Sequence, residues 1–196
     1  MKTTGVWTLS LPLFVDLVFA ASSSLALAPS IAAQYSLSTS TSLPFPTATL
    51  SNSDTQLLLT SSWSLSKGRI QDGSSNVVFV ADPFPNSTLP SGSSSNNDSP
   101  VLQVTYPSGG VGSLDSGSQF YSLWNSSSGF QTMLLSYEVA FDADFPFVKG
   151  GKLPGLRGGS DPNTCSGGSE SNGDCFSTRL MWRTNGAGEG KLCHVI

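Results

Sequence analysis

Short runs of β-branched and aromatic residues recur along the chain from Trp63 onward, and clusters of Gly, Pro, Asn and Ser separate them. Such runs are typical of β-strands, whereas the clusters between them are typical of turns. The strands that this pattern predicts lie at residues 76–81, 101–106, 119–124, 132–141 and 177–183. Short strands separated by turns favour an all-β fold, namely an antiparallel β-sandwich or jelly roll.

Alternation along the last two of these runs assigns their side chains to two faces of a sheet. In the final run we expect Leu180 and Trp182 to be buried, whereas Ser177 and Arg179 point together to the opposite, polar face. In the run 132–141 the side chains expected to face the core are those of Leu135, Tyr137, Val139 and Phe141, with Glu138 on the other face. A polar, Arg-bearing face can hold an extended anionic ligand, although exposed sheet faces are commonly polar for solubility alone.

The N-terminal third of the chain has a different pattern. Residues 1–28 combine a basic start, an apolar stretch and small residues at the exit, which indicates a secretory signal peptide. A membrane anchor is the alternative, but Asp16 interrupts the apolar stretch and a span needs about 20 apolar residues. Residues 29–62 are rich in Ser, Thr and Pro and predict a flexible segment. We therefore expect a secreted protein with no membrane association after signal removal.

The C-terminal end breaks the strand-and-turn pattern. We expect residues 63–189 to form one sheet-rich domain, which ends in a strand that enters a turn. Residues 190–196 then change character and supply no evident returning strand, which would leave an unpaired sheet edge. The sequence thus predicts a jelly roll incomplete at its C-terminus, followed by an aberrant tail. Cys193 and His194 fall in this tail and are poor site candidates for that reason.

Composition narrows the class of ligand. Charged residues make up 11% of the 196-residue chain, and the formal net charge is −4. Its nine basic residues are spread thinly along the chain. This argues against nucleic-acid binding, because phosphate recognition needs a concentrated Lys/Arg surface.

Three further motifs agree with export into an oxidising compartment. Asn86 and Asn125 each begin a tripeptide that accepts N-linked glycans. Cys165 and Cys175 flank a loop rich in Gly, Ser and Asn, which suits a disulfide. A zinc site is the competing interpretation, but one His and no CxxC pair leave too few ligands. We expect neither a metal nor a cofactor.

The densest unusual stretch is the glycine-rich segment 145–159, which contains the cations Lys149, Lys152 and Arg157. Glycines let a backbone approach a ligand closely. A phosphate loop is excluded because Lys152 precedes Leu-Pro rather than a Ser or Thr that opens a helix. By pattern alone, a structural turn remains the more common interpretation of such a loop.

Three segments carry a resemblance to a known family. Their sequences are Gly150-Gly-Lys-Leu-Pro-Gly-Leu-Arg-Gly-Gly, Cys165-Ser-Gly-Gly, and Cys175-Phe-Ser-Thr-Arg-Leu-Met-Trp-Arg. Together they resemble the core of fungal proteins similar to polysaccharide lyase family 14, and Gly117-Ser-Gln119-Phe-Tyr fits the same pattern. The resemblance covers roughly residues 60 to 189.

The resemblance implies a jelly roll that cleaves alginate or glucuronan by β-elimination. It assigns catalytic roles to Lys152, Ser177 and Arg179, and it places Lys149, Arg157, Gln119 and Glu138 as binding candidates for acidic polysaccharide. Arg179 can bind a carboxylate with two parallel hydrogen bonds and stabilise the carbanion formed beside it. Lys152 either takes the proton in its neutral form or binds as a cation. An ordinary structural partnership between Arg179 and Glu138 is the alternative for that arginine.

The family pattern also requires two tyrosines on the strand after the turn at residues 186–189, and none follows here. We therefore expect weak or no turnover by this chain. A non-catalytic carbohydrate-binding module on the same scaffold is the second interpretation, and a fragment that never folds stably is the third. A glycosidase is a weaker alternative, since no spacing singles out a pair among carboxylates such as Glu138, Asp142, Asp144 and Glu189.

Overall fold

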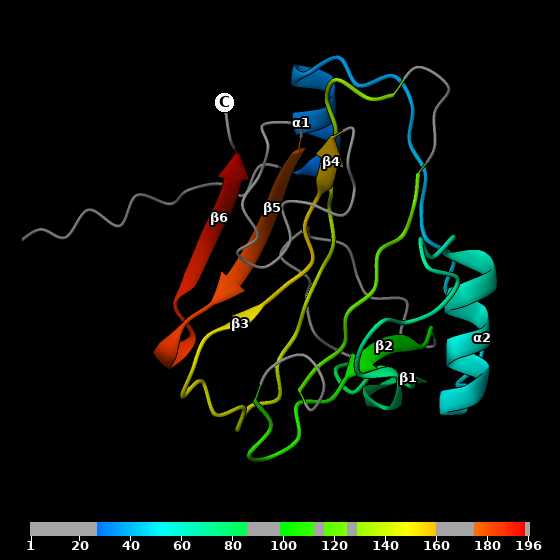
Figure 1. The fold of residues 1–196 in the computed structure, drawn as a ribbon, viewed down its shortest axis with the longest axis vertical. Helices are drawn as coiled ribbons and strands as arrows, with labels where there is room; N and C mark the ends of the chain where they lie inside the picture. The colour runs from blue at the N-terminus through cyan, green and yellow to red at the C-terminus, as the bar shows by residue number, and fades with distance from the viewer. Residues whose placement is uncertain (1–26, 86–98, 112–115, 125–128, 160–174, 195–196) are drawn as a thin grey trace, which may run out of the picture.

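The computed structural model describes residues 27–85, 99–111, 116–124, 129–159 and 175–194. Strands in antiparallel sheets make up most of the regular structure in these ranges, and two α-helices lie near the N-terminus (Figure 1). This agrees with the predicted all-β class. No helix among the described residues is long and apolar enough to cross a membrane. Most of the predicted signal peptide, residues 1–26, lies outside the described ranges.

The largest sheet is built around the strand β5 (Cys175–Trp182). The strand β6 (Gly188–His194) pairs with one edge of β5, from Phe176 opposite His194 to Trp182 opposite Gly188. The short strands β3 (Gly151–Lys152) and β4 (Arg157–Gly159) follow one another along the other edge. All these pairings are antiparallel, and Figure 1 shows β5 between β6 and the β3–β4 edge. This sheet contains the three residues predicted to be catalytic.

A tight turn connects β5 to β6, so the expectation that residues 190–194 supply no returning strand is wrong. The turn contains the 3₁₀ element η2 (Thr184–Gly186), in which Asn185 and Gly186 have φ values of 62° and 76°. Asn and Gly tolerate this left-handed conformation, which matches the twist of a hairpin. The returning strand therefore exists, and residues 190–194 pair with β5. Residues 195–196 lie outside the described ranges.

A second unit packs the helix α2 (Asn52–Ser62) against the hairpin of β1 (Val77–Val80) and β2 (Val101–Val104). The 3₁₀ element η1 (Ser74–Asn76) leads into β1, and the helix α1 (Ala28–Gln34) precedes this unit. Its buried apolar side chains are Leu59, Trp63, Leu65, Ile70, Val77 and Phe79. Figure 1 shows α2 beside β1 and β2, away from β6.

The expectation of a flexible segment at residues 29–62 does not hold for α2. Ser51 caps this helix by accepting a hydrogen bond of 3.1 Å from the Asp54 amide. Thr55 and Leu59 are fully buried, and the Thr55 hydroxyl accepts a hydrogen bond from the Phe79 amide. A few buried contacts with distant β1 thus fix a segment whose composition is typical of a linker.

An aromatic cluster joins the two units at the end of β5. Trp182 is 6% exposed, and its ring centroid lies 5.2 Å from that of Tyr106, which follows β2. The rings of Phe141 and Phe145 pack on Trp182 at 5.4 and 5.8 Å. Edge-to-face contacts of this kind add to the stabilisation that comes from burial. Burial also raises the pKa of the Tyr106 hydroxyl.

The segment 132–141 is not a strand, contrary to expectation. Leu135 and Val139, which were expected in the core, are 39% and 53% exposed. Side-chain contacts position this segment instead, because the Tyr137 hydroxyl donates a 3.0 Å hydrogen bond to the Pro154 carbonyl. Residues 119–124 likewise form only isolated bridges, at Gln119 and Ser122. Alternation of apolar and polar residues alone does not distinguish irregular segments such as these from strands.

Candidate functional site

Ser177 and Arg179 lie together on one face of β5, as alternation predicted. The Arg179 Nη2 atom donates a 3.3 Å hydrogen bond to the Ser177 hydroxyl. Their face is the covered one, however, because Ser177 is only 3% exposed and Met181, on the same face, is buried as well. Leu180, which was expected to be buried, is 52% exposed on the opposite face. The polar face of β5 is therefore partly shielded from water.

Lys152 joins this face through the strand register. Lys152 lies directly opposite Met181 on β5, and Arg157 lies directly opposite Ser177. Residues directly opposite each other in a sheet point to the same side. Both cations therefore share the face of Ser177 and Arg179, and Lys152 is exposed there.

A β-bulge makes this shared face possible. Five steps separate Lys152 from Arg157 along the chain, whereas four steps separate their β5 partners. Side chains alternate between the two faces of a strand, so residues five steps apart normally lie on opposite faces. One additional residue in the edge strand shifts this alternation by one and places Arg157 on the same face as Lys152. Backbone hydrogen bonds bracket the bulge, from the Leu153 amide to the Leu180 carbonyl at 2.8 Å and from the Thr178 amide to the Leu156 carbonyl at 2.7 Å.

Gly155 is required within the bulge because the chain passes very close to β5. A Cβ atom at this position would lie 1.8 Å from the Thr178 carbonyl oxygen and 2.6 Å from the Arg179 Cα. The Leu156 amide also donates a 3.1 Å hydrogen bond to the Thr178 hydroxyl. The glycine-rich loop is thus a structural element that determines where two of its cations lie.

Arg157 is positioned by an aromatic ring as well as by its strand. The centre of its guanidinium lies 5.0 Å from the ring centroid of Tyr121. A cation over an aromatic face is attracted by the electrons of the ring. Tyr121 is fixed in turn, because its carbonyl accepts a 2.8 Å hydrogen bond from the Ser66 amide. Sequence reasoning missed this role for Tyr121, although the residue stands in a motif that carried the family resemblance.

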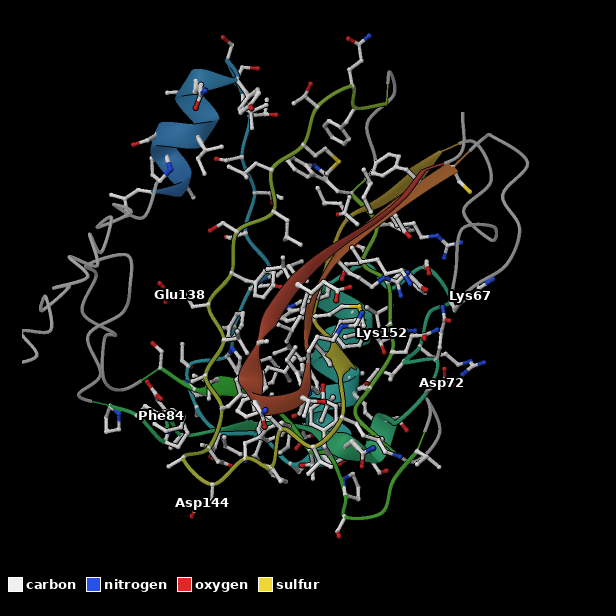
Figure 2. All side chains as sticks on the ribbon, turned by 90° about the vertical axis from the view of Figure 1, so that its left-hand side faces the viewer. Lys67, Asp72, Phe84, Glu138, Asp144 and Lys152 are labelled. Atoms are coloured by element: carbon white, nitrogen blue, oxygen red, sulfur yellow. The ribbon has the colours of Figure 1, made fainter. Side chains whose placement is uncertain are left out.

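The other binding candidates, Gln119, Lys149 and Glu138, lie on loops outside the strands of this sheet. The Gln119 amide group donates a 3.4 Å hydrogen bond to the Gln71 side chain, which connects Gln119 with the loop before η1. Lys149 is exposed in a bend that precedes β3. Figure 2 shows the exposed side chain of Glu138 on the other side of the view from Lys152 and directed away from it. Of the binding candidates, Glu138 is therefore placed away from Lys152.

An ion pair lies at the turn end of the same sheet. Arg183 donates two hydrogen bonds of 2.6 Å to the Glu189 carboxylate. The hydrogen bond from Arg183 lowers the pKa of Glu189, and the same bond raises the pKa of Arg183. Lys191 makes a smaller contribution to the lowered pKa of Glu189. The negative charge of Glu189 is therefore matched mainly by Arg183, with a smaller attraction to Lys191.

Only part of the remaining sequence predictions falls on residues that the structure describes. Cys175 forms a disulfide, and its predicted partner Cys165 lies outside the described residues. Asn86 and Asn125 also lie outside them. Within the described ranges, no group of three or more His, Cys, Asp or Glu residues is arranged to hold a metal ion.

These features define a class of protein, namely an antiparallel sheet protein whose central strand presents an arginine and a hydroxyl group, beside cations of the edge strands, on one partly shielded face. Such a face is suited to bind carboxylate groups. The family model for Polysaccharide lyase 14 matches residues 94–192, and the chain belongs to this family. The matched region includes Lys152, Ser177 and Arg179 and extends into β6. No curated protein and no solved structure matches the chain.

Proposed function

We propose that this chain is a secreted, polysaccharide lyase-like jelly-roll protein that binds uronic-acid polysaccharide, such as alginate or glucuronan, on the face of β5 that contains Ser177 and Arg179. The observation that carries the proposal is the β-bulge, which brings Lys152 and Arg157 to that face. Membership of the lyase family supports a polysaccharide ligand. Cations gathered on one face select a polymer that has a carboxylate on each sugar.

Arg179 and Ser177 are the proposed carboxylate-binding pair. The hydrogen bond between them holds the guanidinium in place before a ligand arrives, so less side-chain freedom is lost on binding. Arg179 is half-buried. Partial exclusion of water strengthens its interaction with an anion relative to an interaction in bulk solvent. Lys152, which is exposed on the neighbouring strand, binds the same or the adjoining carboxylate.

The proposed reaction of this face is β-elimination. A base removes the proton from the carbon that bears the carboxylate, the electron pair forms a double bond to the neighbouring carbon, and the bond from that carbon to the glycosidic oxygen breaks. An acid then protonates the departing oxygen, so that the products are an unsaturated uronate and a shortened chain. Negative charge grows on the carboxylate during proton removal, and Arg179 and Lys152 stabilise it there.

Turnover is proposed to be weak, because proton transfer lacks its expected groups. Strand β6 has the sequence Gly-Glu-Gly-Lys-Leu-Cys-His and contains no tyrosine. A positioned acid or base typically accelerates such a step by about 10² to 10⁴-fold. The same observation favours the second candidate function, in which the chain binds acidic polysaccharide without cleaving it.

One assay distinguishes the two functions. The purified chain is incubated with alginate and with glucuronan, while ultraviolet absorbance reports unsaturated product and calorimetry reports binding. We expect binding with little or no product. Product formation at a rate ordinary for enzymes would contradict weak turnover, and absence of binding to both polymers would contradict the proposed function as a whole. Secretion is tested separately, by looking for a processed and glycosylated chain in the culture medium of a eukaryotic host.

A further inference from the structure

The strand register assigns a further cation to the proposed binding face. Lys191 on β6 lies directly opposite Arg179 on β5. The two residues therefore share the face that also contains Ser177 and Lys152. Lys191 is exposed, so its ammonium group is accessible to a ligand.

Lys191 and Arg179 lie directly opposite each other, and Lys152 lies diagonally from them, opposite Met181, whose own partner on β6 is Glu189. Adjacent strands lie about 4.8 Å apart, and alternate residues on one strand lie about 7 Å apart. Because Lys152 is opposite Met181 and Lys191 is opposite Arg179, the Cα atoms of the two lysines are about 12 Å apart with β5 between them. The long side chains can thus engage different sugars of one polymer.

The charges around Lys191 are mixed in the absence of a ligand: Arg179 lies directly opposite it, whereas Glu189, two residues away on the same face of β6, attracts it. Like charges directly opposite each other in a sheet destabilise it. The nearby carboxylate of Glu189 is held by two hydrogen bonds from Arg183. Two carboxylates, one bound by Arg179 and the next by Lys191, would offset the repulsion between these cations, so the pair fits a polyanion better than a neutral sugar.

We propose that Lys191 binds the carboxylate of a sugar adjacent to the one held by Arg179, so that the polymer crosses β3, β5 and β6 rather than running along β5. This inference rests on the proposed function. It predicts that the chain binds oligouronates more tightly than single uronates. A monouronate is held at Arg179 and does not reach Lys191, whereas longer oligomers contact Lys191 as well. Affinity therefore rises steeply with the first few sugars.

The experiment is a calorimetric titration of the full chain with oligouronates of one to four sugars. Removing a single ion-pair partner on an exposed surface weakens binding by a modest factor. We expect Lys191→Gln to weaken tetramer binding about three- to tenfold and to leave monomer binding unchanged. Lys191→Arg should retain the affinity of the original chain. Lys149→Gln is the matched control, since it removes the same charge from the bend before β3.

A thermal measurement provides an independent readout. Without ligand, Lys191→Glu should change the unfolding temperature little, because the attraction to Arg179 that it gains is offset by the repulsion from Glu189 on the same face. The same variant should lose most of the stabilisation that added tetramer confers.

Three results bear on the inference in different ways. Equal affinities of the original chain and Lys191→Gln for every oligomer, with binding still lost in Arg179→Gln, would overturn the role of Lys191 and leave the proposed function standing. Equal weakening by Lys149→Gln and Lys191→Gln would overturn it too, because net charge would explain both. No binding of any oligouronate by the original chain would reject the proposed function and this inference together.

Discussion

Replacement of Gly155 by Ala tests the structural basis of the cationic face. The new methyl group would lie 1.8 Å from the Thr178 carbonyl oxygen, whereas ordinary contacts begin at 3.4 Å. The β3–β4 edge must therefore move away from β5 by roughly 1.5 Å to accommodate it. This movement separates the β3–β4 edge from β5 at the bulge. The bulge is the feature that places Lys152 and Arg157 on the same face of the sheet.

The cost can be worked out from the contacts that the movement disturbs. Forcing extra volume into a packed site costs about 1–3 kcal/mol. The two backbone hydrogen bonds beside the bulge contribute about 0.5–1.5 kcal/mol each, and at least one of them must lengthen. The free energy of unfolding should thus fall by about 3 kcal/mol, a large part of the stability of an ordinary domain.

Urea unfolding followed by tryptophan fluorescence measures this loss, since Trp182 lies at the end of the same sheet. Gly188→Ala is the matched control. Gly188 lies in β6 with no atom within 4 Å of its added methyl group, so this variant should unfold within about 1 kcal/mol of the original chain. Equal stabilities of the Gly155→Ala and Gly188→Ala variants, with uronate binding retained in both, would refute the proposed close approach of the bulge to β5.

Three further substitutions test separate contacts. Thr55→Val leaves the Phe79 amide without its buried hydroxyl partner and should cost about 1–3 kcal/mol in urea unfolding, whereas Thr55→Ser should cost less. Arg183→Gln should raise the pKa of Glu189 toward its ordinary value, as seen by NMR titration. Because the folded-state pKa of Glu189 is lowered, the contribution of its ion pair is present at neutral pH and is lost as the pH falls through that pKa. Tyr137→Phe removes the hydrogen bond to the Pro154 carbonyl and should destabilise the chain by about 1 kcal/mol or less, again in urea unfolding.

Several strands could be predicted from the sequence because their local pattern and their tertiary environment agree. The runs that become β1, β2 and β5 combine β-branched or aromatic residues with clear turn signals. Ser177 and Arg179 are two residues apart on a strand, so their shared face followed from alternation alone. The addition of Lys152 to that face could not be derived from the sequence, because it depends on the position of a bulge.

The incorrect expectations have physical causes that differ from one segment to the next. Helix α2 and the segment 132–141 are determined by contacts with distant residues, such as Thr55 with Phe79 and Tyr137 with Pro154. Local composition contains no information about such contacts. The assignment of Leu180 to the core failed because both faces of β5 are partly covered, so hydrophobicity does not identify the inner one. Strand β6 was not expected because its composition is unusual for a strand, although Asn185-Gly186 is a typical turn sequence for a hairpin.

The most direct test of the central claim is the affinity of the chain for a defined tetrauronate, compared with that of the variants Arg179→Gln and Lys152→Gln. Each variant should weaken binding about tenfold or more, and Lys152→Gln, whose side chain is exposed, should retain the unfolding temperature of the original chain. Undiminished binding by both variants would show that the carboxylates are bound elsewhere, and it would contradict the assignment of this face of β5 as the polysaccharide site.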